Sequence, residues 1–177
     1  MRHLLLSILL VSISSMSFAE APNEVEYLDL SKVESSKQFH FLVGNWSYAT
    51  ANNMAHGKST GSLQVGDSVI SETTHGNFGE SAFIGQALYL YDSEHQQWRQ
   101  HWIDSLGSVL ESSVKMEEYI ESELPAMVGE LEFQDQKLKH VWYNITENGY
   151  QTDLLVYNDE SKSYQLIRRM PYRKVTE

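Results

Sequence analysis

The chain has 177 residues, with 13 basic against 24 acidic side chains, a formal net charge of −11 at neutral pH and no cysteine. So acidic a chain is not expected to bind nucleic acid or an anionic membrane surface, because both require clustered lysine and arginine. Without cysteine it has neither disulfides nor a thiol-linked lipid anchor, so its hydrophobic core must stabilise the fold alone.

The first 19 residues have the pattern of a signal peptide. Arg2 precedes an apolar, serine-rich stretch over residues 4–18 that is too short to span a bilayer. Two small-x-small cleavage sites overlap here, and we expect cleavage after Ala19, because the second site would place Pro22 next to the scissile bond. The expected location is the periplasm or the extracellular medium, with no membrane anchor, and the oligomeric state is left open.

Residues 20–34 are acidic and unpatterned, which predicts a mobile arm in front of one domain over residues 35–177. A short helix is expected at the junction. Ser31 and Glu34 offer an N-terminal cap, and Gly44 is a typical stop. So short a helix must pack on the domain through the apolar residues Phe39, Phe41 and Leu42.

Beyond residue 44 the sequence consists of short β-rich runs separated by turn residues, with no long helical periodicity. Asn148-Gly149 is the strongest hairpin signal among the turns. Ten strands without crossover helices predict an all-β fold, an antiparallel up-and-down barrel of about eight to ten strands with the short helix closing one end. The strands are expected over residues 44–51, 59–65, 68–75, 82–91, 98–104, 108–116, 125–133, 137–146, 150–157 and 163–170.

Gly44-Asn45-Trp46, at the start of the first predicted strand, resembles the Gly-x-Trp signature of lipocalins and other calycins. In that superfamily the tryptophan packs at the closed barrel end against an arginine from the last strand. The resemblance implies a structural role for Gly44 and Trp46 with Arg169 as the partner, and it leaves Arg168 and Arg173 as alternatives.

A second resemblance covers residues 38–173. A family of exported bacterial domains of unknown function with a lipocalin-like barrel carries Phe-x-Phe-x-x-Gly-x-Trp near its start and Trp-x-Gln-x-Trp-x-Asp-x-x-Gly in its middle. This chain departs from the family at His40, where the family often has aspartate. The matching residues here are Phe39, Phe41, Gly44, Trp46, Tyr91, Asp92, Trp98, Gln100, Trp102, Asp104, Gly107, Tyr172 and Arg173.

The run of residues 83–104 is typical of a β-hairpin with its turn at residues 92–97. This turn places Tyr91 opposite Trp98, so alternate residues of both strands share one aromatic face. Aromatic walls with a few polar groups are typical of small-molecule cavities. The sequence therefore predicts a binding site for a small apolar or aromatic molecule formed by Tyr89, Tyr91, Trp98, Gln100, Trp102 and Asp104.

Three alternatives to this binding site remain. The aromatic residues would instead fill a solid barrel that acts only through its surface. Asp104 would be the general acid or base of a barrel-housed enzyme if burial raised its pKa. His140 would be the axial ligand of a haem inside the barrel. The leading interpretation is a binding protein without a cofactor and without enzymatic activity.

The remaining polar residues give weaker signals. Glu72, His75 and His101 have no metal-ligand spacing, so no metal site is expected. The C-terminal basic cluster is a possible anion site, but in so acidic a chain we expect it to pair within the molecule. This cluster consists of Arg168, Arg169, Arg173 and Lys174.

Overall fold

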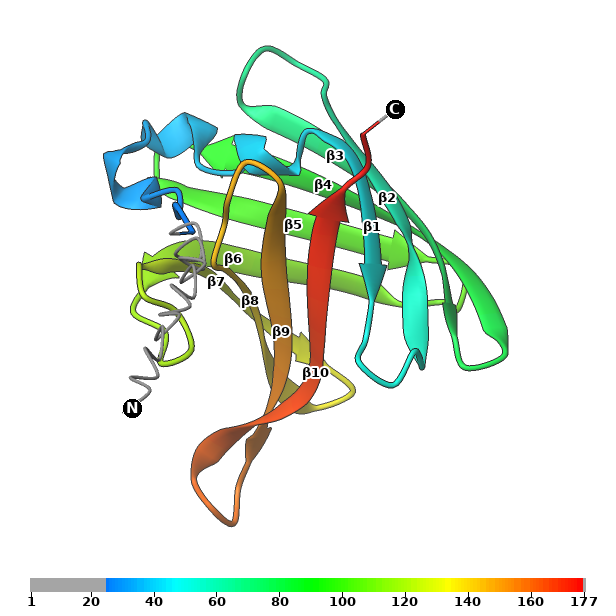
Figure 1. The fold of residues 1–177 in the computed structure, drawn as a ribbon. Helices are drawn as coiled ribbons and strands as arrows, with labels where there is room; N and C mark the ends of the chain where they lie inside the picture. Colours follow the sequence, from blue (N-terminus) through cyan, green and yellow to red (C-terminus); the bar gives the residue numbers. More distant parts are fainter. Residues whose placement is uncertain (1–24, 177) are drawn as a thin grey trace, which may run out of the picture.

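The computed structural model describes residues 25–176, which form one closed antiparallel barrel of ten strands (Figure 1). The expected signal peptide and its cleavage site lie outside the described residues. The strands are β1 (Gly44–Ala49), β2 (Ala55–Leu63), β3 (Val69–Phe78), β4 (Ser81–Asp92), β5 (Gln97–Asp104), β6 (Val109–Glu117), β7 (Ala126–Phe133), β8 (Gln136–Tyr143), β9 (Gly149–Asn158) and β10 (Ser163–Lys174).

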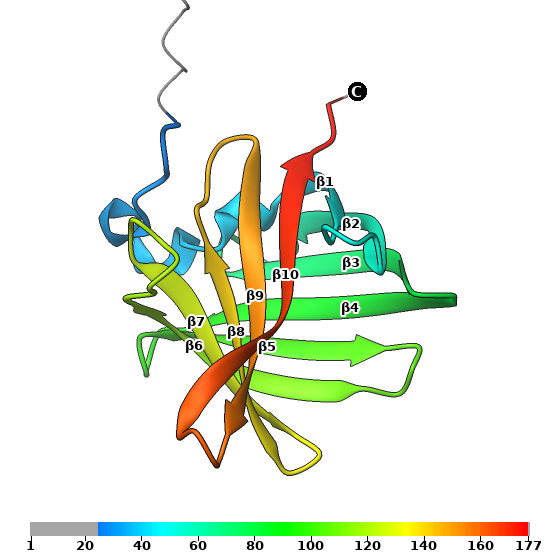
Figure 2. The same ribbon diagram turned by 60° about the horizontal axis from the view of Figure 1, so that its bottom comes forward.

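Each strand pairs with its sequence neighbours, and β10 pairs with β1 to close the barrel. The predicted all-β, up-and-down topology is therefore confirmed. The barrel is flattened, and in Figure 2 strands β3–β5 run across the direction of β9 and β10. Hairpin loops alone connect the strands at one end, where β1, β3, β5, β7 and β9 finish. We call this end the open end.

Two predicted strand boundaries differ from the structure by four residues, and the others differ by three or fewer. Strand β2 begins at Ala55 rather than at residue 59, because its polar N-terminal half pairs residue by residue with β3. Strand β10 continues through Pro171 to Lys174 rather than ending at residue 170. Its ladder with β1 begins at Tyr172, so the missing N–H of Pro171 lies outside that ladder.

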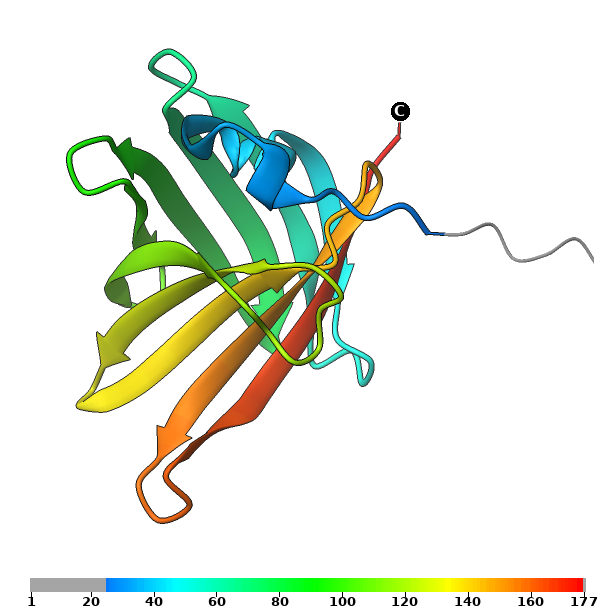
Figure 3. The ribbon, with the colours of Figure 1, turned by 90° about the vertical axis from the view of Figure 1, so that its left-hand side faces the viewer.

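The segment in front of β1 crosses the other end of the barrel (Figure 3). It forms three 3₁₀ turns, Leu30–Lys32, Ser35–Lys37 and His40–Leu42, rather than one regular helix. The arm expected over residues 20–34 is packed where the structure describes it, because Leu30 is buried and the Leu28 N–H donates to the Ile145 carbonyl at 2.7 Å. Across the described residues, we find no helix with the length and apolarity needed to cross a membrane.

Trp46 is buried at this closed end. Its indole N–H donates to the Leu42 carbonyl at 2.9 Å, and its ring packs edge-on against Tyr150. Gly44 has a φ of +129°, a backbone conformation that favours glycine. The cation near the Trp46 ring is Lys174, 5.8 Å from its centre, so the expected contact with Arg169 is wrong.

Arg169 lies on the outer face of the barrel instead. Its guanidinium donates to both carboxylate oxygens of Asp153, at 2.9 and 2.7 Å. Asp153 is fully buried beneath the loop between β6 and β7, and the hydroxyls of Tyr119 and Tyr143 donate to it as well. This cluster holds the loop against the outside of the barrel. Among the four C-terminal basic residues expected to pair within the molecule, Arg169 alone forms an ion pair in the described chain.

Candidate functional site

The barrel contains a cavity of about 290 Å³, so its interior is not solid throughout. The half under the 3₁₀ turns is filled, because the Phe39 ring lies within 5.2 Å of the rings of Tyr89, Trp98 and Trp142. The cavity occupies the other half and extends to the open end, where Phe78, Leu106 and Phe133 line it. Most of its remaining wall is aromatic or aliphatic, with residues from eight strands: Tyr48, Phe83, Trp102, Leu110, Leu131, Leu138, Trp142, Tyr150, Leu154, Met170 and Tyr172.

Four of the six residues predicted to bind a ligand line this cavity: Tyr89, Gln100, Trp102 and Asp104. They come together because β4 and β5 pair in the predicted register, with Tyr91 opposite Trp98 and Tyr89 opposite Gln100. The Trp102 ring packs against Gly85 on β4, where a side chain would overlap it. Gly85 thus makes room for the Trp102 ring.

Tyr91 and Trp98 share this face but do not reach the cavity. The Trp98 indole N–H donates to the Ser35 carbonyl at 2.8 Å, and the Tyr91 hydroxyl donates to Gln96 at 3.1 Å. Both residues lie at the end of the hairpin beneath the 3₁₀ turns, so they belong to the packed half of the barrel.

A chain of hydrogen bonds crosses the cavity floor from β2 to β6. Ser59 and Tyr89 donate to the two carboxylate oxygens of Glu72, at 2.5 and 2.9 Å. Gln100 donates to the Tyr89 hydroxyl at 3.3 Å and accepts from Ser112 at 3.2 Å. Burial raises the pKa of Glu72 despite the two hydrogen bonds that favour its ionised form. These hydrogen bonds hold five polar side chains in fixed orientations.

Asp104 has a structural environment rather than that of a general acid. Its carboxylate accepts from the Trp102 indole at 3.0 Å and from the backbone N–H groups of Leu106 and Ser108 at 2.9 and 3.0 Å. Burial opposes its ionisation, but these hydrogen bonds outweigh burial and hold the pKa of Asp104 below its ordinary value. The raised pKa that the enzyme alternative requires is therefore not found, and Asp104 instead orients Trp102 and the β5–β6 turn.

His140 lies on the cavity wall, with its ring 3.9 Å from the centre of the Trp142 ring. Burial, and next the charge of Arg168, lower its pKa to about 3, so its imidazole is neutral at physiological pH. A neutral imidazole suits haem coordination, but the ring packs tilted against Trp142. The cavity also lies at the small end of the range for ligand pockets, about 300–1,000 Å³. Within residues 25–176, histidine and acidic side chains form no group of three that could hold a metal ion.

Arg168 projects into the same cavity from β10, and burial lowers its pKa. Its guanidinium lies 4.5 Å from the centre of the Phe78 ring. Within the described chain it forms no ion pair, and its buried Nε has no hydrogen-bond partner. The Tyr48 hydroxyl, on the neighbouring strand β1, is also buried without a partner.

A β-bulge explains why Arg168 points inward. Leu166 pairs with Leu155 and Arg168 with Leu154, so Ile167 is an extra residue in β10. The extra residue reverses the alternation of inner and outer side chains. Tyr164, below the bulge, packs on the outer cluster, whereas Arg168, four residues on, faces the cavity.

A crevice on the barrel wall between β6 and β7 adjoins the cavity. These strands pair only from Ser113 opposite Glu130 to Glu117 opposite Ala126, and they separate toward the open end. The separation leaves a crevice of about 620 Å³ on the barrel wall. Four residues line both the crevice and the cavity, which therefore adjoin each other: Gln100, Ser112, Leu131 and Leu138.

Sequence reasoning did not place Arg168, Tyr48 or Ser112 in the site. Tyr48 was detectable, because it follows Trp46 at a spacing of two and so shares its inward face. Arg168 had no such signal, since the bulge that turns it inward leaves no sequence pattern in the run Leu166-Ile167-Arg168-Arg169.

No family model matches the chain, and no curated protein matches its sequence. Among solved structures the chain is similar to an S-type phycobiliprotein lyase from Guillardia theta, with a TM-score of 0.53. The two are 10% identical, and the alignment covers 84% of this chain and 96% of the lyase. At this identity the similarity shows the fold alone, a closed antiparallel β-barrel.

Proposed function

We propose that this protein is an exported binding protein that holds one small apolar or aromatic molecule in the open half of its barrel. The observation that carries the proposal is the cavity of about 290 Å³ with a largely aromatic wall. A cavity of this kind, fixed by closed strands and containing a few oriented polar groups, is the usual form of a small-molecule site. Its small volume favours a molecule of one or two rings over a larger one.

The wall and floor have separate roles in this proposal. Trp102, fixed by Asp104 on one side and Gly85 on the other, offers a flat apolar surface for stacking. Gln100 and Tyr89, held in the hydrogen-bonded chain to Glu72, present polar atoms at the deep end. Export remains a proposal supported by the signal-peptide pattern of residues 1–19, and membership in the family of exported bacterial domains by the Phe-x-Phe and Trp-x-Gln-x-Trp-x-Asp motifs.

Binding is favoured over catalysis because the structure removes the reason for a catalytic Asp104, whose pKa is lowered rather than raised. The phycobiliprotein lyase shares the barrel fold, but at 10% identity its activity is not carried over to this chain. A purely structural barrel is disfavoured because it would have no reason to retain a polar, partly unpaired cavity wall.

Native mass spectrometry of protein purified from its own host tests the proposal. We expect an additional mass that is lost on denaturation. Leu131→Trp, which fills the cavity, should abolish it, whereas Leu88→Trp, the same change on the exposed outer face of β4, should retain it. A mass equal to haem would instead support His140 as an axial ligand. Wild-type protein without any added mass, and without affinity for small aromatic compounds in calorimetry, would contradict the proposal.

A further inference from the structure

The cavity contains a positive charge that the protein does not neutralise. Arg168 is charged at every physiological pH, because its guanidinium keeps its proton even when burial lowers its pKa. Burying such a charge without a partner costs several kcal/mol. Within residues 25–176 no carboxylate lies within 4.0 Å of it, and its Nε has no hydrogen bond at all.

The two carboxylates of the cavity are engaged elsewhere. Glu72 is held by Ser59 and Tyr89 at the floor, and Asp104 by Trp102 and the β5–β6 turn. The neighbouring Arg169 shows how this chain treats an arginine that stabilises the fold, since it binds the buried Asp153 through two hydrogen bonds. Arg168 lacks such a partner although it is the more deeply placed of the two.

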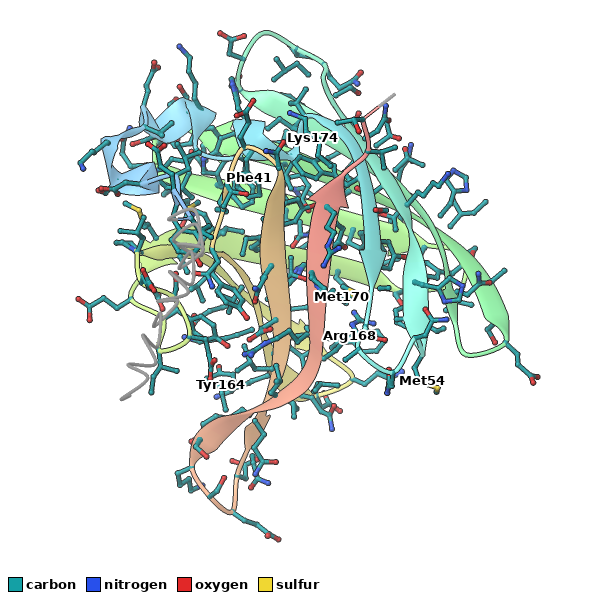
Figure 4. All side chains as sticks on the ribbon, viewed as in Figure 1. Phe41, Met54, Tyr164, Arg168, Met170 and Lys174 are labelled. Atoms are coloured by element: carbon teal, nitrogen blue, oxygen red, sulfur yellow. The ribbon has the colours of Figure 1, made fainter. Side chains whose placement is uncertain are left out.

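The residues around Arg168 reinforce a preference for an anion. The Tyr48 hydroxyl, whose pKa burial raises to about 12, keeps its proton and has no acceptor. His140 is the nearest titratable group on the β8 side. It pairs with Leu154, which pairs in turn with Arg168, so His140 and Arg168 lie on one inward-facing row across three strands. Figure 4 shows the position of Arg168 on β10, between Met170 and the bend that leads to Tyr164.

We propose that the ligand of this barrel is an organic anion, a carboxylate attached to a small aromatic or apolar body, and that Arg168 binds the carboxylate while Tyr48 donates to it. The inference rests on the proposed function, since it names the chemical class of the molecule in the same cavity. A planar guanidinium matches the two oxygens of a carboxylate. The body of the ligand then lies against Trp102 and the aliphatic residues of the opposite wall.

Titration calorimetry with 2-naphthoate and its neutral isostere 2-naphthamide tests the inference. Both have the same ring body, so they differ only in the polar group, which is a charged carboxylate with two acceptor oxygens in one and a neutral amide in the other. Wild-type protein should bind 2-naphthoate at least about tenfold more tightly, the factor expected for a charge-assisted hydrogen bond. Arg168→Met should remove this preference and leave the affinity for 2-naphthamide nearly unchanged.

Arg173→Met is the matched control, because it is the same change on the same strand at an exposed position. It should retain the wild-type preference, and Arg168→Gln serves as a second variant with a polar side chain. Equal affinities of wild-type protein for the two compounds, or a preference that persists in both Arg168 variants, would overturn the anion inference and leave the binding function standing. If neither compound binds, the anion inference is overturned, whereas the proposed function is contradicted only if native mass spectrometry also finds no added mass.

Discussion

Arg168 and Arg169 are adjacent in β10, yet Arg169 binds the buried carboxylate of Asp153 at 2.7 Å on the outside of the barrel while Arg168 points into the cavity without an ion pair in the described chain. The bulge at Ile167 determines which of the two faces inward. One arginine therefore stabilises the fold, and the other is available for a ligand.

The first prediction compares these two arginines in stability. Arg169→Met should lower the free energy of unfolding by about 3 kcal/mol, because it leaves the charge of Asp153 buried with only two tyrosine hydroxyls. This value is at the lower end of the usual range for breaking a buried ion pair, since the Arg169 side chain is 38% exposed. Arg168→Met should keep or raise stability, because it strands no partner and removes a buried charge that has none in the described chain. Urea denaturation of both variants checks this, and a larger loss for Arg168→Met would show that we have assigned the two roles the wrong way round.

The second prediction concerns the closed end. Trp46→Ala should destabilise the protein by about 3–5 kcal/mol, because it removes a ring that is 2% exposed and packed on Tyr150. Affinity for a cavity ligand, measured in the residual folded protein, should not change. Trp46→Phe keeps a ring but loses the hydrogen bond to Leu42, so it should cost much less. An unchanged denaturation midpoint for Trp46→Ala would contradict a structural role.

The third prediction concerns the pH dependence of stability. Burial raises the folded-state pKa of Glu72 above its ordinary value of 4.5, so the folded protein holds this proton more tightly than the unfolded chain does. Stability should therefore fall, relative to Glu72→Gln, as the pH rises from 4.5 through the raised pKa. Urea denaturation of both proteins at acid and neutral pH measures the difference. A difference that is the same at both pH values would show that Glu72 titrates normally.

Much of the fold could be predicted because the signals for it are local. Alternating aromatic residues and turn dipeptides define strands, and the 92–97 turn fixes the register of β4 and β5, from which Tyr89, Gln100 and Trp102 follow as inward-facing. The same alternation placed Trp98 on the correct face but could not show that the 3₁₀ turns cover that half of the barrel. The position of a side chain along the barrel axis, in the packed half or in the cavity half, depends on packing between segments that are distant in the sequence.

The polar part of the site depended on features that alternation does not contain. Arg168 faces inward only because Ile167 interrupts the ladder. Strict alternation counted from Pro171 would place Arg168 on the inner face, whereas alternation counted from Tyr164 would place it on the outer face. Lys174 replaces arginine near Trp46 because β10 runs past residue 170, the predicted end of the strand, to Lys174. Both differences arise from a single irregular strand.

The last prediction concerns Asp104, which could lie in a solvated pocket or be paired with an arginine. The structure shows no arginine partner in the described chain; the carboxylate accepts from the Trp102 indole and two backbone N–H groups. Asp104→Asn keeps one acceptor oxygen for the backbone but turns an amide N–H₂ toward the indole N–H. At neutral pH this substitution should therefore lower the free energy of unfolding by about 1 kcal/mol, the value of one hydrogen bond. Breaking a buried ion pair would cost roughly 3–5 kcal/mol instead.

This cost should disappear in acid. The folded-state pKa of Asp104 lies below its ordinary value of 3.8, so the stability that its carboxylate contributes is complete above 3.8 and is lost as the pH falls through the lowered pKa. Below that lowered pKa, the denaturation curves of wild-type protein and Asp104→Asn should converge. Asp159→Asn is the control, because it changes an exposed turn, and it should match wild-type protein at every pH. Curves that stay apart in acid would mean that the lost hydrogen bond does not depend on the charge of Asp104, and a loss of about 3 kcal/mol or more at neutral pH would mean that Asp104 has an ionic partner.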